Sequence, residues 1–280
     1  MRAQASETAK HVARLRAAHQ VLEGGAIFAD LLAAPILGES ADAVARELSG
    51  RPELTRLRLF VAARSRFAED SLAAALDHGV CQAVVLGAGL DTFGLRNPHA
   101  GRGLRVIEID HPATQQWKRE LIDRAGIALP STLSFADVDF ERETLADGLA
   151  KGGFDANRPA FFIWLGVVPY LTRDAIFATL SFIAGLPGGE VVFDYPQPLD
   201  HHPPARRGAI EAIMARSAAL GEPWLSFFDP AGLRAELTAI GFTDIEDLGP
   251  HEVAKRYGDG PVPPAGTAGP HLLRARRLSG

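Results

Sequence analysis

Two glycines one residue apart follow an apolar run in the stretch VVLGAGLDT, which spans residues 84–92. A strand that ends at Gly87 and Gly89 lets the backbone of the next turn approach a ligand closely, because neither residue carries a side chain. Asp110 stands 23 residues after Gly87 and ends the run LRVIEID. An acid at this distance, at the end of the second strand, can hold the hydroxyls of a ribose. The spacing therefore predicts a turn that binds a nucleoside.

The residues inside the turn discriminate between cofactors. A dinucleotide fingerprint, G-x-G-x-x-G, needs a third glycine at position 92, where this chain has Thr92. Asp91 also occupies the turn, and its carboxylate competes for the amide donors and repels a diphosphate. S-adenosylmethionine has a ribose and a sulfonium cation but no phosphate, so the pattern favours a methyl donor. A plain tight turn without a ligand remains the alternative for the two glycines alone.

Longer blocks of the sequence resemble a known family. The runs VVLGAGLDTFGLR, VIEIDHPATQQWK and FFIWLGVVPYLT, with ARSRFAED and ETAKHVARLRAAHQ upstream, are similar to the leucine carboxyl methyltransferase family. That family includes a bacterial branch of S-adenosylmethionine-dependent O-methyltransferases that act on polyketides and other small molecules. The resemblance covers about residues 6–240. It implies the class I methyltransferase fold, an α/β Rossmann-like seven-stranded sheet with the last strand antiparallel.

The resemblance also assigns residues that bind S-adenosylmethionine and its product S-adenosylhomocysteine. It implies that Asp110 holds the ribose hydroxyls and that His111 forms part of the cofactor wall. It further implies that an arginine of ARSRF, Arg64 or as second choice Arg66, grips the cofactor carboxylate, and that Asp137 lies near the adenine amino group. The expected cofactor-binding residues are Arg64, Arg66, Gly87, Ala88, Gly89, Asp110, His111, Asp137, Val138 and Leu165.

Ordinary structural roles compete with several of these assignments. A solvated helix charge is the alternative for either arginine, and a turn cap is the alternative for Asp137. The position of Leu165 departs from the family pattern, because the leucine carboxyl methyltransferases proper have a glutamate after the fourth strand. This departure favours a small-molecule O-methyltransferase, with a protein C-terminal carboxyl methyltransferase as the alternative.

The elements that position these residues follow from the hydrophobic pattern. After residue 80, short apolar runs bounded by Gly, Pro and Asp alternate with helical segments, which indicates a parallel sheet. The expected strands are CQAVVLG, GLRVIEID, TLSFADVDF, PAFFIWLG and GGEVVFDYP, followed by FTDIEDL and HLLRARRL as an antiparallel hairpin at the sheet edge. Helices are expected over residues 6–22 with Ser6 as N-cap, about 52–76, 112–125, 173–186, about 206–220, and 231–240 with Asp229 as N-cap and Pro230 at N1.

We divide the chain into an N-terminal helical cap over residues 1–80 and a methyltransferase domain over 81–280, which together form one structural unit. An insertion over residues 196–228 carries four prolines in its first part and then a helix. It leaves the carboxyl end of the fifth strand, where open α/β sheets bind ligands. We expect this insertion and the N-terminal helix to close over the donor as a lid.

Three residues are candidates for acid–base chemistry on the methyl acceptor. A carboxylate acceptor is already ionised at neutral pH, whereas a phenol with a pKa near 10 needs about 3 units of help from a base. The candidates are Tyr170 after the fourth strand, Asp194 in the fifth strand and His202 in the insertion. Their alternatives are a packing aromatic, a turn cap and an exposed loop residue.

Composition limits the other classes. The formal net charge of −5 and the lack of a long basic block disfavour nucleic acid as a partner. The single cysteine, Cys81, excludes an intrachain disulfide and a thiolate metal site, and we expect no metal. The N-terminus lacks the apolar core of a signal peptide and no run of about 18 apolar residues occurs, so a cytoplasmic location without a membrane partner is expected.

The partner is therefore expected to be a small-molecule acceptor. The sequence leaves the oligomeric state open, with a homodimer as one option. Two readings from other classes remain beside the methyltransferase. One is a nicotinamide-dependent oxidoreductase on a Rossmann fold, and the other is a cofactor-binding protein without turnover.

Overall fold

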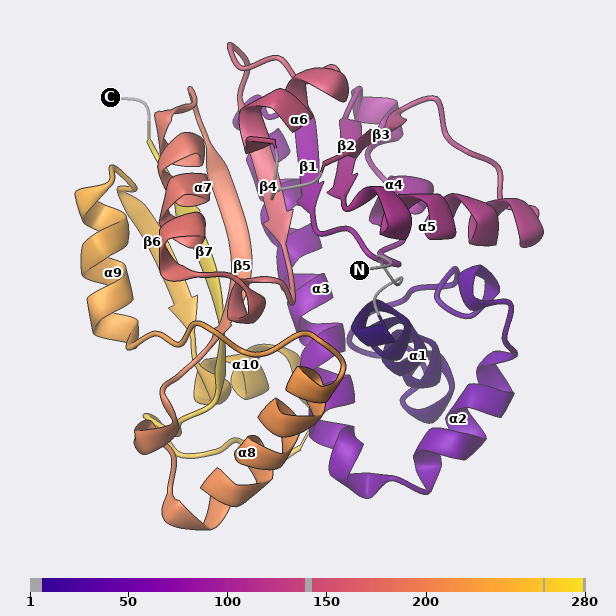
Figure 1. The fold of residues 1–280 in the computed structure, drawn as a ribbon, viewed down its shortest axis with the longest axis vertical. Helices are drawn as coiled ribbons and strands as arrows, with labels where there is room; N and C mark the ends of the chain where they lie inside the picture. The colour runs from indigo at the N-terminus through magenta and orange to yellow at the C-terminus, as the bar shows by residue number, and fades with distance from the viewer. Residues whose placement is uncertain (1–6, 139–142, 259, 279–280) are drawn as a thin grey trace. The chain divides into compact units, whose positions relative to one another are not determined.

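The computed structural model describes residues 7–138, 143–258 and 260–278 (Figure 1). The chain divides into two compact units. The first comprises residues 1–73 and 81–155, and the second comprises residues 74–80 and 156–280. The expected cap of Ser6 on the first helix lies outside the described residues.

Three parallel strands form the sheet of the first unit: β1 (Gln82–Leu86), β2 (Arg105–Asp110) and β3 (Leu133–Asp137). Every residue of β1 is buried. A uniformly apolar strand is typical of a parallel sheet, because helices cover both of its faces. The register places Asp110 opposite Asp137 at the carboxyl ends of β2 and β3, which brings two acidic residues from the sequence analysis to one edge.

The second unit contributes β4 (Ala160–Trp164), β5 (Glu190–Pro196), β6 (Asp244–Leu248) and β7 (Pro270–Arg276). β4 and β5 are parallel, whereas β7 runs antiparallel to both β5 and β6. The strand order is β3-β2-β1-β4-β5-β7-β6. The predicted seven-stranded α/β sheet is confirmed, and so is the antiparallel hairpin at its edge.

Helices of the first unit gather mostly at the N-terminus: α1 (Glu7–Leu22), α2 (Ala41–Ser49), and α3 (Thr55–Leu76), whose last residues belong to the second unit. Small residues of α1, among them Ala17 and Ala18, pack with Val44 and Leu48 of α2 and Val61 of α3 in one buried cluster. The alanines allow this close approach, and α2 was absent from the predicted helices. The other helices of this unit are α4 (Phe93–Arg96), α5 (Pro112–Arg124) and α6 (Leu145–Lys151). It also contains the 3₁₀ turns Pro35–Leu37, Pro52–Leu54 and Ala100–Arg102.

Helices of the second unit are α7 (Arg173–Gly185), α8 (Pro204–Ala219), α9 (Pro230–Ala239) and α10 (Pro250–Tyr257), with 3₁₀ turns at Val168–Tyr170 and Leu199–His201. Asp229 caps α9 as expected, because its carboxylate accepts the Gly232 N–H at 2.8 Å and Pro230 takes the first helical position. The helix α10 was not predicted.

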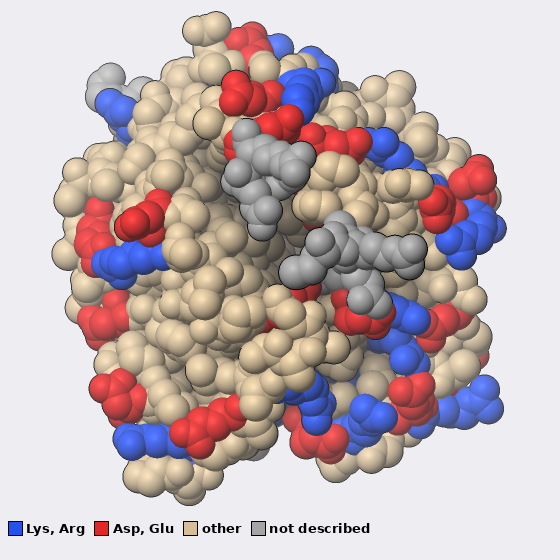
Figure 2. Space-filling view, viewed as in Figure 1, with Lys and Arg blue, Asp and Glu red and all other residues tan. Residues whose placement is uncertain are grey.

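The surface carries no long block of one charge on the face in Figure 2, where acidic and basic side chains are interspersed. Among the residues that the structure describes, no helix has the length and apolar character needed to cross a bilayer.

Candidate cofactor site

The turn after β1 is built around its two glycines. Gly87 and Gly89 have φ angles of +63° and +47°, in the left-handed region that favours glycine. The Ala88 N–H donates to the carbonyl of Ile109 in β2 at 3.1 Å. A β-carbon at Gly89 would lie 3.0 Å from the side chain of Ala9 in α1. The turn is therefore held against β2 and α1, with bare backbone at position 89.

Asp110 joins the end of β2 to this turn. One of its carboxylate oxygens accepts the Gly89 N–H at 2.6 Å, and the other accepts the N–H of His111 at 2.7 Å. Burial raises the pKa of Asp110, although the two backbone donors act against that rise. Each oxygen retains capacity to accept a further hydrogen bond, so the carboxylate can still bind a hydroxyl. The structure thus brings the predicted glycines and the predicted acid together.

Asp91 uses the amide that a phosphate would need. Its carboxylate accepts the Phe93 N–H at 2.7 Å, at the start of the four-residue helix α4. The neighbouring Thr92 donates its hydroxyl to the buried carboxylate of Asp30 at 2.8 Å. Both observations agree with the argument from sequence against a diphosphate in this turn, since the carboxylate already occupies an amide donor.

The ends of β2 and β3 hold the other predicted residues of the first unit. His111 caps α5, because its Nδ1 accepts the Ala113 N–H at 3.2 Å. The half-exposed Asp137 pairs with Arg119 at 2.9 Å. Val138 is buried, and its N–H donates to the carbonyl of Asp110 at 3.0 Å. These contacts assign a fixed structural role to each residue and keep all of them beside Asp110.

The two arginine candidates on α3 differ in environment. Arg64 is buried, whereas Arg66 is half-exposed and pairs with Asp70 one turn later at 2.7 Å. The buried arginine Arg58 of the same helix binds the carboxylate of Glu23, with its shortest contact at 2.6 Å. Burial therefore separates Arg64 from Arg66, which has the exposure expected of a solvated helix charge.

The predicted residues of the second unit surround the end of β4. Asp194 is buried and accepts the N–H of Gly166 at 2.5 Å, which fixes the turn after β4 beside the half-buried Leu165. Tyr170 ends the 3₁₀ turn that follows and is half-buried.

His202 is buried, which corrects the alternative of an exposed loop residue; His201 is the exposed member of the pair. Burial is the main cause that lowers the pKa of His202, and Arg206 adds to it. Within the described part of the chain, Nδ1 of His202 is buried without a hydrogen-bond partner. A lowered pKa keeps the imidazole neutral, so that one ring nitrogen presents a lone pair.

Comparison with known proteins decides the family. The model of the leucine carboxyl methyltransferase family matches residues 9–184. The chain belongs to the leucine carboxyl methyltransferase family. The match includes the glycine turn, Asp110 and the β4 end, and it stops inside α7.

Relatives of this family member include bacterial proteins. The candidate S-adenosyl-L-methionine-dependent methyltransferase YktD of Bacillus subtilis (strain 168) is 36% identical over 193 residues, which cover 68% of this chain and 63% of that protein. A candidate methyltransferase of Mycobacteroides abscessus with the same cofactor in its name is 28% identical over 243 residues, 81% of this chain and 74% of that protein. The matched region covers about three-fifths of the full length of YktD.

Solved structures agree on the fold of this family member. A candidate methyltransferase from Thermobifida fusca YX superposes with a TM-score of 0.58 at 17% identity, over 95% of this chain and 94% of that one. A DUF574 family protein from Streptomyces avermitilis superposes with a TM-score of 0.57 at 16% identity, over 94% of this chain and 97% of that one. The predicted class I methyltransferase fold is confirmed.

One cluster of the second unit connects side chains from three neighbouring strands of the sheet. The hydroxyl of Tyr195 in β5 donates to Asp247 in β6 at 2.6 Å, and the other oxygen of Asp247 lies 2.8 Å from Nδ1 of His271 in β7. The rings of Tyr195 and His271 stack with centroids 5.1 Å apart. Burial and the neighbouring carboxylate raise the pKa of Tyr195, which keeps its hydroxyl protonated as a donor. The register of the hairpin was the signal that could have placed Asp247 and His271 together.

We expect Tyr195→Phe to lower the free energy of unfolding by about 1–3 kcal/mol, because a buried carboxylate oxygen of Asp247 loses its donor. Urea denaturation of Tyr195→Phe, Asp247→Asn and the double variant measures the coupling. An interaction energy above about 0.5 kcal/mol is expected for residues in one hydrogen-bond network. Additive effects would contradict a direct contact between the two side chains.

Proposed function

We propose that this chain binds S-adenosylmethionine and transfers its methyl group to an oxygen atom of a small molecule. The observation that carries the proposal is the bond between the Asp110 carboxylate and the Gly89 N–H, in a turn where Asp91 already binds the N–H of Phe93. Membership of the leucine carboxyl methyltransferase family and the names of the bacterial relatives support it.

The residues present fit this cofactor. When bound, S-adenosylmethionine supplies a methyl group on a positively charged sulfur. Gly89 lets the turn take its left-handed backbone conformation against Ala9, and the carboxylate of Asp110 can accept hydrogen bonds from ribose hydroxyls. The buried guanidinium of Arg64 is suited to the cofactor carboxylate, because its planar set of N–H donors matches the two carboxylate oxygens. Asp137 and Val138, next to Asp110, provide the edge expected for the adenine.

The acceptor side favours a small molecule. The apolar Leu165 stands where the carboxyl methyltransferases proper carry a glutamate, which disfavours a protein carboxylate as substrate. A carboxylate of a small molecule needs no base. For a hydroxyl acceptor, the neutral imidazole of His202 has an unpartnered buried nitrogen that can take the proton, whereas an oxygen of Asp194 is already bound to Gly166.

The assay for this function uses the protein with isotopically labelled S-adenosylmethionine and a metabolite extract, read by mass spectrometry. Labelled methyl esters or ethers of small molecules, formed only with intact protein, are the expected result. Label on protein C-termini would instead identify a protein carboxyl methyltransferase. Thermal stabilisation by NAD and not by S-adenosylhomocysteine would replace the proposal with the oxidoreductase.

We expect Asp110→Ala to weaken the binding of S-adenosylhomocysteine by about 1–3 kcal/mol in calorimetry, the scale for hydrogen bonds to a charged group. In the wild type, affinity should fall as the pH is lowered through the raised pKa of Asp110, because protonation removes the charged acceptor. Asp123→Ala on the exposed side of α5 is the matched control and should bind normally. Equal affinity of Asp110→Ala and this control would remove Asp110 from the site.

The insertion over residues 196–228 has the construction of a lid. Its helix α8 has one buried or half-buried stripe, formed by Arg207, Ile210, Met214 and Ser217, and its other residues are exposed. Few buried contacts mean low local stability, so such a helix can move without unfolding the sheet.

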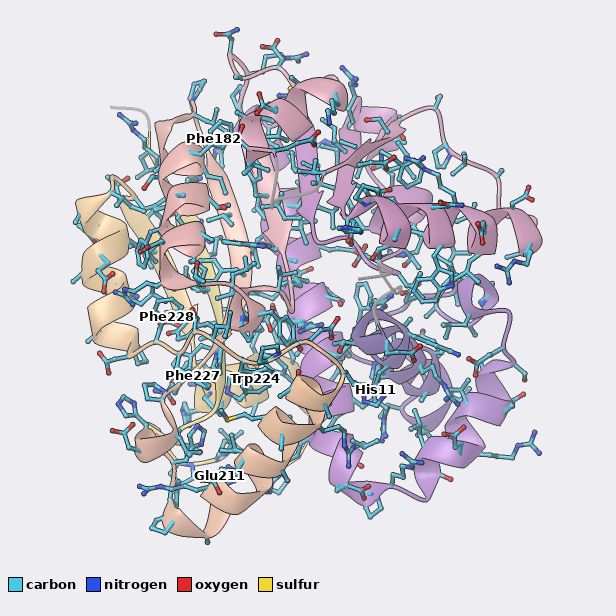
Figure 3. The ribbon with its side chains drawn as sticks, viewed as in Figure 1. His11, Phe182, Glu211, Trp224, Phe227 and Phe228 are labelled. Atoms are coloured by element: carbon cyan, nitrogen blue, oxygen red, sulfur yellow. The ribbon has the colours of Figure 1, made fainter. Side chains whose placement is uncertain are left out.

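Backbone hydrogen bonds hold the C-terminal end of the insertion in place. Leu225 N–H donates to the carbonyl of Pro169 at 2.6 Å, and Phe228 N–H donates to that of Pro196 at 3.0 Å. The Phe228 ring also packs edge-on against Tyr195 with centroids 6.1 Å apart. Figure 3 shows Trp224, Phe227 and Phe228 along the segment between α8 and α9. The part of the insertion that we expect to move is therefore residues 199–223.

Hydrogen exchange should show residues 199–223 becoming protected when S-adenosylhomocysteine and an acceptor are added together. Residues 225–228 and strands β4 and β5 should exchange slowly in both states, since their backbone bonds are already formed. Equal exchange of residues 199–223 with and without the two ligands would exclude a lid at this position.

A further inference from the structure

Asp30 lies fully buried in the first unit and receives three hydrogen bonds. Arg16 Nε donates to it at 2.9 Å, the Thr92 hydroxyl at 2.8 Å and the Leu32 N–H at 3.2 Å. Arg16 also donates to the carbonyl of Leu90 at 2.6 Å. Asp30 and Arg16 thereby connect the N-terminal segment to two positions of the glycine turn.

A second charged pair closes the network around Thr92. Arg96 Nε donates to the Thr92 hydroxyl at 3.0 Å, and a terminal nitrogen of Arg96 lies 2.5 Å from Glu69 in α3. The guanidinium also lies over the ring of Phe28, 5.2 Å from its centroid. Two carboxylates and two guanidiniums therefore balance in charge around one hydroxyl, which both donates and accepts.

We propose that Asp30 and Thr92 are positioning residues of the cofactor turn, and that residues 7–34 form a fixed wall of the cofactor site. The sequence had suggested that the N-terminal helix moves with the lid. The network points instead to a segment already fastened to the turn before any ligand binds. The effect of this network on cofactor affinity rests on the proposed S-adenosylmethionine function, whereas its effect on the conformation of the turn does not.

The identity of residue 92 follows from this role. A glycine at position 92 would complete the dinucleotide pattern but would leave Asp30 and Arg96 without their shared hydroxyl. Removing a partner from a buried charged network leaves the remaining groups desolvated and unpaired, which is more costly than losing an exposed pair. Only serine or threonine provides a hydroxyl at this point without the bulk of a ring.

If Asp30 had only a general stabilising role, then breaking any other buried ion pair of this region should disturb the glycine turn to the same extent. Glu23 and Arg58 provide the comparison, since they join the end of α1 to α3 and contact each other at 2.6 Å. In the described part of the chain, the side-chain hydrogen bonds of Glu23 go to Arg58 and His19, and none of them reaches the turn. Glu23→Gln is therefore a matched control for Asp30→Asn.

The first measurement is hydrogen exchange of the ligand-free protein over residues 88–96. Asp30→Asn and Thr92→Val should speed exchange there by at least about fivefold relative to β1, the lower range for coupling between sites. Thr92→Ser should restore wild-type exchange, and Glu23→Gln should leave the ratio unchanged. Wild-type exchange in Thr92→Val, or an equal rise in Glu23→Gln, would overturn the proposal. If Asp30→Asn does not fold, Thr92→Val and Thr92→Ser decide it.

The second measurement is calorimetry with S-adenosylhomocysteine as the probe. Asp30→Asn and Thr92→Val should bind at least about fivefold more weakly than Thr92→Ser and Glu23→Gln. Wild-type protein that binds no S-adenosylhomocysteine would refute the proposed function, while the exchange data would still decide whether the network positions the turn. Normal affinity in both variants would overturn the positioning role in a protein that binds the probe.

Discussion

The bond between the carboxylate of Asp110 and the N–H of Gly89 is the contact on which the candidate site depends. It connects the end of β2 to the turn after β1, so two neighbouring parallel strands share one polar edge. The carboxylate is partly buried, and such a group is stabilised by hydrogen-bond donors. Those donors are backbone amides, which a glycine in the left-handed region directs toward the acid.

Much of the fold could be predicted from the sequence because its strands are short runs rich in apolar residues and the segments between them carry Gly, Pro and Asp. The seven strands, the edge hairpin and the cap of α9 follow from such local signals. The helix α2 was missed although Val44, Ala45 and Leu48 recur at helical spacing after Ser40 at the N-cap position, because the segment is only nine residues long. The helix α10 was also missed, although Pro250 at its first position and Gly258 after its last residue are local signals of a helix start and end.

The residues of the candidate site also fall into those that could be predicted from the sequence and those that could not. The glycine turn and Asp110 are recognisable because they directly follow two neighbouring strands, at a spacing set by the length of the segment between those strands. Contacts between residues far apart in sequence leave no local pattern, such as Asp30 with Thr92, 62 residues apart, or Tyr195 with Asp247, 52 residues apart. Sequence could name both Arg64 and Arg66, but only burial separates them, because both carry the same charge on the same helix.

The hydroxyl of Thr92 has a consequence for how this fold could acquire a different cofactor. A change to glycine at that position alone would break a buried charge network before any phosphate could bind, and Asp91 would still occupy the amide of Phe93. Several substitutions would have to occur together, including one that removes the charge of Asp30. Each intermediate on such a path would be less stable than the starting protein. The contacts of Thr92 and Asp91 therefore oppose a stepwise change to a phosphate-containing cofactor, even though the first two glycines of the turn match the dinucleotide pattern.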